Sequence, residues 1–287
     1  MPVRLSGWGA VMAGKGVEYW NSVGDSWSRK RQKLWRAHSD AVNCALIARW
    51  LPQAAAGRVL KTDLFDEMCS EGLYPLLAPL GPLFVGIDLS GKTLRAARAR
   101  HQDIQAVAAD VLTLPFAEGT FDLIISTSTL DHFESPAAIA DSLAELFRVL
   151  RPGGRMIITM DNPANPLVAL RNSLPFRLLN LLGVTPYYFG ATCDQRELQG
   201  MLTETGFTVL ASDAVLHCPR VFAVAAAHLL EGFASLRAQR AFLRILISFE
   251  RLRTLRTRNL TGHFIAALAI KQPFAHPMAM AQVENQP

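Results

Sequence analysis

The sequence predicts an α/β fold built on a largely parallel sheet. Three observations lead to this prediction: short apolar segments recur from residue 57 onward, helical segments separate them, and several apolar segments end in an aspartate. Strands that alternate with helices of this length form βαβ units, in which neighbouring strands run parallel. The strand candidates are GRVLK at residues 57–61, VGID at 85–88, IQAVAAD at 104–110, FDLIISTSTL at 121–130 and RMIITM at 155–160.

The segments between these strands have helical patterns with recognisable ends. Ser90 is a suitable N-cap for a basic amphipathic helix over residues 91–101. A second helix, over residues 136–150, is expected to stop at the RPGG turn that follows it. The downstream elements are expected in this order: a helix over 194–207, a strand over 208–216 and a closing strand over 262–271.

The chain divides into a helical cap, a sheet domain with insertions, and a tail. The first 56 residues have a helical pattern rich in Trp and Arg, which predicts a cap packed on the sheet. The sheet domain is expected over residues 57–272, with helical insertions at 162–193 and 219–260. Residues 273–287 are expected to form a flexible tail.

Composition and cysteine spacing favour a cytoplasmic protein without a metal site. The chain has 287 residues, of which 50% are hydrophobic, and a formal net charge of +5. Its four cysteines form no CxxC pair, so neither a metal cluster nor a disulfide framework is expected. We expect no signal peptide at the start, and the longest apolar segment, residues 221–230, is too short to span a bilayer.

Carboxylates at the ends of successive strands are the most informative feature. Asp63, Asp88 and Asp110 each end or closely follow an apolar strand, so all three are expected along one edge of the sheet, where open parallel sheets bind ligands. An acid after the second strand is placed to accept both hydroxyls of a ribose, and one after the third to accept an adenine amino group. The alternative is that each aspartate simply caps a helix.

Four segments carry a resemblance to a known family. GIDLS, AADVLTLPF, GTFDLIISTSTLDHF and RVLRPGGRMIIT resemble the later motifs of class I, seven-stranded S-adenosylmethionine-dependent methyltransferases. The resemblance covers roughly residues 58–270 and is strongest over 85–159. It implies a Rossmann-like, mostly parallel sheet of seven strands with helices on both faces, and S-adenosylmethionine as the cofactor.

The resemblance also implies roles for individual residues. Asp88 would bind the ribose hydroxyls and Leu89 would pack on the adenine. Asp110 would hold the adenine amino group, with the Val111 backbone beside it. Two residues after the fourth strand would lie along the methionine part of the cofactor: Ser126 and Thr127.

The loop after the first strand departs from the family pattern. The family has an acid followed by alternating glycines there, because the backbone approaches the cofactor closely. This chain has TDLFDE over residues 62–67, and its nearest glycine downstream is Gly72. Asp63 or Asp66 could still receive the ammonium group of the cofactor. We therefore expect cofactor binding through a reshaped loop; the alternative is that binding has been lost.

Two neighbouring residues are candidates for acid–base chemistry. His132 is the better candidate, because it follows the fourth strand near the expected reacting edge and histidine titrates near neutral pH. Asp131 is the second candidate. The alternative is that both residues make only local hydrogen bonds. Tyr19, in the N-terminal cap, would reach the cofactor if the cap closes over it.

An apolar insertion after the fifth strand predicts the acceptor site. In the resembling family this region commonly covers the substrate, and here it carries Tyr187, Tyr188 and Phe189, with leucines at 178, 181 and 182. Such a lining suits a small apolar or aromatic acceptor. The alternative is ordinary core beneath a lid, and both interpretations also apply to the cap tryptophans Trp20, Trp27 and Trp35.

The segment over residues 236–258 carries seven arginines opposite an apolar stripe. A helix of this kind can lie on an anionic membrane surface, which would make the protein peripheral to the inner face of a membrane. The alternative is a surface helix with solvated charges. Nucleic acid is not an expected partner, because the arginines are not interleaved with aromatic stacking residues.

The leading hypothesis is thus an S-adenosylmethionine-dependent methyltransferase that acts on a small, apolar or aromatic acceptor. A second hypothesis keeps the cofactor but assigns chemistry other than methyl transfer, because the first loop is altered. A third is a non-catalytic, membrane-associated binding protein with a vestigial pocket.

Overall fold

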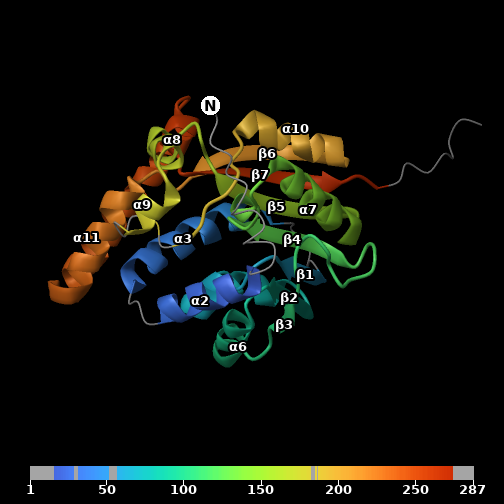
Figure 1. Ribbon diagram of the computed structural model, residues 1–287, viewed down its shortest axis with the longest axis horizontal. Helices are drawn as coiled ribbons and strands as arrows, with labels where there is room; N and C mark the ends of the chain where they lie inside the picture. The colour runs from blue at the N-terminus through green and yellow to red at the C-terminus, as the bar shows by residue number, and fades with distance from the viewer. Residues whose placement is uncertain (1–15, 29–31, 52–56, 182–184, 186, 274–287) are drawn as a thin grey trace, which may run out of the picture.

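A computed structural model describes residues 16–28, 32–51, 57–181, 185 and 187–273 (Figure 1). Its centre is a seven-stranded sheet with the strand order β3-β2-β1-β4-β5-β7-β6. The first five strands pair in parallel, and β7 runs antiparallel to both β5 and β6. The strands are β1 (Arg58–Lys61), β2 (Leu83–Asp88), β3 (Gln105–Ala108), β4 (Phe121–Thr127), β5 (Leu150–Asp161), β6 (Phe207–Val215) and β7 (Phe264–Lys271).

This topology confirms the predicted α/β fold and fixes where a ligand can bind. The chain leaves β1 toward β2 and β3, then returns to the other side of β1 as β4 and β5. Loops on the two sides of β1 therefore diverge at the carboxyl edge of the sheet, which opens a crevice there.

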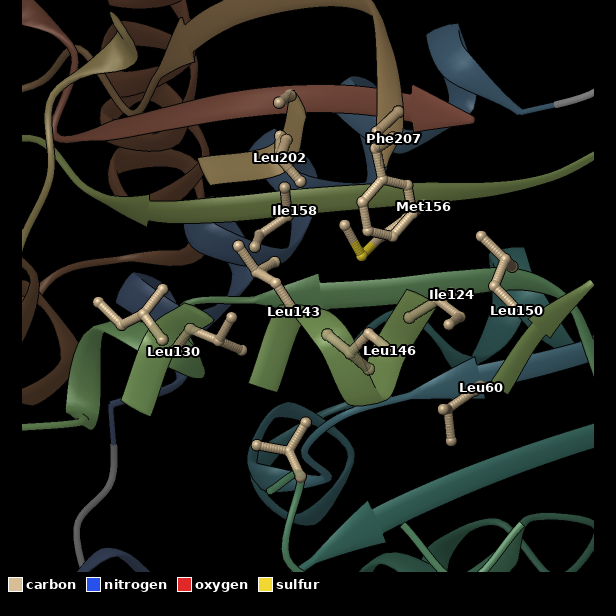
Figure 2. Close-up of a cluster of buried hydrophobic side chains, with 14 of the residues drawn as sticks. Leu60, Ile124, Leu130, Leu143, Leu146, Leu150, Met156, Ile158, Leu202 and Phe207 are labelled. Atoms are coloured by element: carbon tan, nitrogen blue, oxygen red, sulfur yellow. The ribbon is translucent and has the colours of Figure 1, made fainter. Parts of the chain in front are cut away.

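Helices cover both faces of the sheet. One face packs on α7 (Pro136–Val149) and α10 (Gln195–Thr205), and Figure 2 shows part of this core, including Leu143, Met156 and Leu202. The opposite face packs on α3 (Lys33–Trp50), α5 (Tyr74–Leu77), a short 3₁₀ helix (Ala78–Leu80) and α6 (Gly91–Arg100), and α4 (Phe65–Cys69) packs against α6.

Local sequence determines the ends of these helices. Ser90 caps α6 as predicted, because its hydroxyl accepts a hydrogen bond from the Thr93 N–H. Asp194 and Glu197 form a capping box at the start of α10, which ends at Gly206 in the left-handed region with a φ of 106°.

The predicted cap and insertions contain the remaining helices. The described part of the cap is α2 (Gly16–Ser28) and α3. The insertion after β5 contains α8 (Pro166–Ser173) and α9 (Phe176–Leu181). The insertion after β6 contains α11 (Arg220–Phe233), α12 (Leu236–Ser248), a 3₁₀ helix (Phe249–Thr254) and α13 (Arg258–Thr261). All but the first residue of the predicted tail lie outside the described residues.

The apolar stripe of α12 has a partner within the protein. Phe242, Leu246 and Phe249 pack in a cluster with Leu46 of α3 and Val215 of β6, whereas the arginines point outward. Part of the stripe predicted to meet a membrane therefore packs within the protein, whereas Ile245 of the same stripe is 58% exposed. No described helix combines the length and the hydrophobicity that crossing a bilayer requires.

Candidate functional site

A cavity of about 630 Å³ opens at the carboxyl edge of the parallel strands. Residues that end or follow β1, β2, β3 and β4 form its floor, and residues of α2 and α3 form its cover. Asp63, Asp88 and Asp110 all line this cavity, as the sequence predicts for acids at successive strand ends. Leu89 and Val111 line it beside them.

The carboxylates of Asp88 and Asp110 are held by backbone but keep free acceptor capacity. Asp88 accepts hydrogen bonds from the N–H of Ser90 at 2.7 Å and of Leu64 at 3.2 Å, and Asp110 accepts one from the N–H of Leu112 at 3.0 Å. Each carboxylate has about four acceptor sites, so both can accept further donors from a ligand. Neither caps a helix with its side chain, because Ser90 caps α6 and no described helix starts at Asp110.

Asp88 lies in a poorly solvated position. Burial raises its pKa to about 6, and the nearby carboxylate of Asp63 acts in the same direction. Hydrogen bonds from Ser90 and Leu64 and the charge of Lys61 oppose this shift. A donor that binds the ionised carboxylate would therefore stabilise a charge that the unliganded protein accommodates poorly.

Ionic contacts hold the glycine-poor loop after β1. The Lys61 side chain is fully buried beneath the loop, and its Nζ donates to the Asp63 carbonyl at 2.8 Å. The same Nζ lies 3.0 Å from a Glu67 carboxylate oxygen and 3.4 Å from one of Asp63. Burial alone disfavours the ammonium, but the surrounding carboxylates raise the pKa of Lys61 above its ordinary value, so it remains charged.

A glycine in β2 makes room for the bulky loop. The Leu64 side chain is fully buried and packs with Ile125, Leu77 and Leu94 on the α3–α6 face of the sheet. A Cβ added at Gly86 would overlap the Leu64 side chain. Leu64 thus points into the core rather than into the cavity, so it does not obstruct a ligand there.

Of the two acids predicted to receive an ammonium group, the structure leaves Asp63 as the more accessible. Asp66 lines the cavity, but its carboxylate lies 2.7 Å from the guanidinium of Arg36. Asp63 accepts a hydrogen bond from Thr129 at 3.2 Å.

The end of β4 offers one of its two predicted polar residues to the cavity. Thr127 lines it, and the Thr127 hydroxyl is buried without a hydrogen-bond partner among the described residues. Such an orphaned hydroxyl fits a site that a polar ligand completes. Ser126 does not line the cavity, because its side chain turns inward and accepts a hydrogen bond from Thr62 at 3.1 Å. Ser128 lines it instead, with a strained φ of 51° that sequence reasoning did not anticipate.

His132 lines the cavity, whereas Asp131 does not. The Nδ1 atom of His132 lies 2.9 Å from the Tyr188 carbonyl. Since a carbonyl only accepts, Nδ1 carries the proton, which makes Nε2 the basic nitrogen. The Asp131 carboxylate is buried and accepts hydrogen bonds from the Ser128 hydroxyl and the Asp161 N–H. Its predicted role in catalysis is thus corrected to a structural one.

The predicted aromatic lining is reduced to one residue. Tyr187 lines the cavity, and its ring meets the His132 ring at 5.6 Å. Tyr188 and Phe189 stack on each other outside the lining. Tyr19 also lies outside it, because its hydroxyl accepts a hydrogen bond from the Tyr188 N–H at 2.6 Å.

The leucines and tryptophans proposed beside the acceptor divide between the cavity and the surface. Leu178 and Leu181 are exposed rather than part of the lining, and Leu182 lies outside the described residues. Trp20 and Trp35 line the cavity, whereas the side chain of Trp27 lies outside the described part of the structure.

Several cavity residues that the sequence analysis did not single out come from distant elements. Among them are Arg36 of α3, Arg220 of α11 and Phe264 of β7. No local motif marks any of them. In the described part of the chain, no group of three or more His, Cys, Asp or Glu side chains is arranged to hold a metal ion.

Part of the sheet domain matches a known family of sequences. Residues 68–158 match a family model described as a methyltransferase domain. A demethylmenaquinone methyltransferase of Beutenbergia cavernae is 33% identical over 44% of this chain and 46% of its own length. A malonyl-[acyl-carrier protein] O-methyltransferase of Enterobacter lignolyticus is 28% identical over 72% of this chain and 78% of its own length. With the first curated relatives, the alignment spans only about a third to a half of the relative's length.

Solved structures show the same fold. A methyltransferase described as putative, in complex with the Trm112 activator of Haloferax volcanii, superposes with a TM-score of 0.58 at 14% identity over 91% of this chain and 99% of its own. The [4+2]-cyclase SpnF superposes with a TM-score of 0.51 at 18% identity over 80% of both chains.

Residues 68–158 therefore match a methyltransferase domain, and the sheet order and the acids at the strand ends agree with the class I S-adenosylmethionine-dependent methyltransferases that the motifs resemble. The glycine-poor loop after β1 is a local departure from the pattern of that class. S-adenosylmethionine is the cofactor of the class, and the free acceptors of Asp88 and Asp110 and the orphaned hydroxyl of Thr127 fit its polar groups.

Proposed function

We propose that the protein transfers a methyl group from S-adenosylmethionine to a small molecule with an apolar or aromatic body. One observation carries the proposal: a single cavity is lined by the strand-end acids and by aromatic side chains, and His132 lines it in ring contact with Trp20 and Tyr187. The curated relatives are named for chemically different acceptors. The proposal of an apolar or aromatic acceptor therefore rests on the residues that line the cavity and not on the names of the relatives.

The cofactor half of the cavity is assigned to residues at the strand ends. Asp88 would accept hydrogen bonds from the ribose hydroxyls, and Asp110 would accept one from the adenine amino group. Leu89 and Val111 would pack on the adenine. Thr127 would donate to the amino acid end, where Asp63 would meet the ammonium group.

The protein's part in the reaction is positioning, exclusion of water and removal of one proton. When bound, S-adenosylmethionine supplies an electrophilic methyl group on its sulfonium. Helices α2 and α3 cover the cavity, and an oriented acceptor then needs little further activation for in-line displacement. Where the acceptor atom carries a proton, His132 would take it on Nε2, while Nδ1 continues to donate to the Tyr188 carbonyl.

Calorimetry with S-adenosylhomocysteine tests the cofactor site. We expect binding to the wild-type protein and weaker binding to Asp88→Ala, because the ribose hydroxyls lose a charged acceptor worth about 1.5–3 kcal/mol for each hydrogen bond. Arg196→Gln is the control, since Arg196 is exposed on α10 and lies outside the cavity lining. Absence of binding by the wild-type protein at millimolar ligand would refute the proposal and favour the vestigial pocket.

Product analysis separates methyl transfer from other chemistry on the same cofactor. Mass spectrometry of turnover mixtures should show S-adenosylhomocysteine accumulating together with an acceptor heavier by one methyl group. Turnover that leaves S-adenosylmethionine intact would favour the second hypothesis. The altered loop after β1 motivates that hypothesis, since in the proposed binding mode the loop would contact the end of the cofactor that carries the sulfonium.

We further propose that α11 and α12 bring the protein to an anionic membrane. The stripe of α12 is only partly buried, and Phe222, Leu229 and Phe233 of α11 are 71%, 64% and 93% exposed. Exposed arginines of α12 lie close along the chain: Arg237, Arg240 and Arg244. Apolar side chains beside cationic ones are the combination that binds the surface of anionic lipid. A protein of the cytoplasm held in this way would take an apolar acceptor from the bilayer.

A further inference from the structure

A cationic wall closes one side of the cavity. Arg220, the first residue of α11, lines the cavity, and its guanidinium contacts two neighbours. One terminal nitrogen donates to Nε2 of His263 at 2.8 Å, and the other donates to the Tyr187 hydroxyl at 3.2 Å. A guanidinium has five N–H donors. Within the described part of the chain, no hydrogen-bond partner is assigned to the other three.

Arg220 lacks a carboxylate partner of its own among the described residues. Among the described residues, no carboxylate lies within 4.0 Å of its guanidinium. Asp161 is the nearest candidate, but its carboxylate lies 2.6 Å from the guanidinium of Arg171. His263 adds no charge near neutral pH, because burial lowers its pKa to about 4. Arg171 and Arg220 therefore both depend on Asp161 for a counter-charge, and among the described residues Arg220 has no carboxylate in direct contact.

A second cation lies near the first. Arg36 lines the same cavity. Burial lowers the pKa of the Arg220 guanidinium, whereas Tyr187 and Asp161 raise it above its ordinary value. The charge of Arg36 makes a smaller contribution that lowers this pKa. Arg36 is paired with Asp66, but its Nε is buried without a hydrogen-bond partner among the described residues. Bringing two like charges together in a poorly solvated cavity is unfavourable unless an anion compensates them.

The surroundings of Arg220 are apolar. Its guanidinium lies 6.0 Å from the centre of the Trp35 ring and 5.9 Å from that of Phe264, and Leu216 completes this part of the lining. Tyr187 connects this region to the expected reaction centre, since its hydroxyl meets Arg220 and its ring meets His132. An acceptor bound here would extend across the face of Tyr187.

We propose that the acceptor carries an anionic oxygen group, a carboxylate or a phosphate, which binds the Arg220 guanidinium with Arg36 beside it. The apolar body of the acceptor packs between Trp35 and Phe264, and the atom to be methylated lies toward His132. Arginine presents a planar fork of donors that matches the oxygens of either group. This inference rests on the proposed function and narrows its acceptor class from apolar to amphipathic and anionic.

Binding of anionic and uncharged ligands with similar apolar bodies tests the proposal. The probes are 4-phenylbutanoate, its uncharged amide and 3-phenylpropyl phosphate, titrated by calorimetry into protein saturated with S-adenosylhomocysteine. We expect at least one of the two anions to bind the wild-type protein about tenfold or more tightly than the amide. Comparing the two anions decides between carboxylate and phosphate. Arg220→Gln should abolish the preference over the amide, and Arg196→Gln should retain it.

The outcomes separate the two proposals. S-adenosylhomocysteine affinity, measured first for every protein, reports on the cofactor site alone and shows that each variant is folded. If that ligand binds but the wild-type protein prefers neither anion to the amide, including no detectable binding of any probe, the inference about Arg220 is overturned. An unchanged preference in Arg220→Gln also overturns it. Arg220→Lys keeps the positive charge but loses the planar set of guanidinium donors, so it is expected to retain part of the preference for the anion over the amide. This variant replaces Arg220→Gln in the test if the Gln variant does not fold.

Discussion

Acidification from pH 8 to pH 5 is expected to weaken the binding of S-adenosylhomocysteine about tenfold through Asp88. Burial raises the pKa of this carboxyl group to about 6, so it is ionised at pH 8 and mostly protonated at pH 5. A protonated carboxyl group is a poorer acceptor for ribose hydroxyls. Ionisation with a pKa near 6 leaves about one molecule in eleven competent at pH 5, which corresponds to about 1.4 kcal/mol of binding free energy.

The effect has the opposite sign for the unliganded fold. Because the folded pKa lies above the ordinary aspartate value, the unliganded protein loses stability as the pH rises through about 6. Bound ligand reverses this loss by satisfying the ionised group. Asp88→Asn should therefore stabilise the unliganded protein at pH 8 and weaken ligand binding there.

Calorimetry at pH 5, 6, 7 and 8, in two buffers of different ionisation enthalpy, measures both the affinity and the proton released on binding. Other groups face Asp88 or line the same cavity, namely Lys61, Asp63, Asp110 and His132, so the variant is needed to assign the profile. Asp88→Asn should bind with an affinity that varies little over this range. A flat wild-type profile, or an unchanged slope in Asp88→Asn, would refute the reasoning.

Three further predictions concern the loop, the strand beneath it and the surface. Lys61→Met should lower the free energy of unfolding in urea by about 3–5 kcal/mol, because Glu67 loses its buried partner, and a loss below about 1 kcal/mol would contradict the ionic account. Gly86→Ala should cost about 1–3 kcal/mol by overpacking against Leu64, and less in a Leu64→Ala background; equal costs in both backgrounds would argue against that contact. The wild-type protein should float with anionic but not with neutral liposomes, and Phe233→Asp should reduce the floated fraction; flotation unaffected by this change would exclude α11 as the contact.

Local sequence was sufficient for much of the fold and for the cofactor edge. A parallel sheet requires apolar strands separated by helices, and its carboxyl edge collects whatever follows each strand, so Asp63, Asp88 and Asp110 could be placed together from their positions alone. The N-cap at Ser90 likewise depends only on neighbouring residues. Such inferences succeed because they depend on interactions between residues that are close in the sequence.

The sequence pattern did not distinguish residues that face the cavity from those that turn away. Ser126 and Thr127 are adjacent in β4, yet alternate side chains of a strand point to opposite faces, and only Thr127 lines the cavity. Asp131 and His132 diverge in the same way within one turn of a 3₁₀ helix. Moving along the chain by one residue changes whether a side chain faces the cavity, and the sequence motif alone does not determine which residues face it.

The sequence by itself determined the class of fold, the order of its elements and the edge at which a cofactor binds. Only the tertiary structure decided how the glycine-poor loop is held and what the acceptor meets. The loop depends on a buried Lys61 and on Gly86 in the neighbouring strand, while the proposed acceptor wall joins Trp35, Tyr187 and Arg220 from three distant segments. The burial of a side chain and the charges around it depend on the residues that pack against it. Those residues come from distant parts of the sequence, so neighbouring residues in the chain do not predict them.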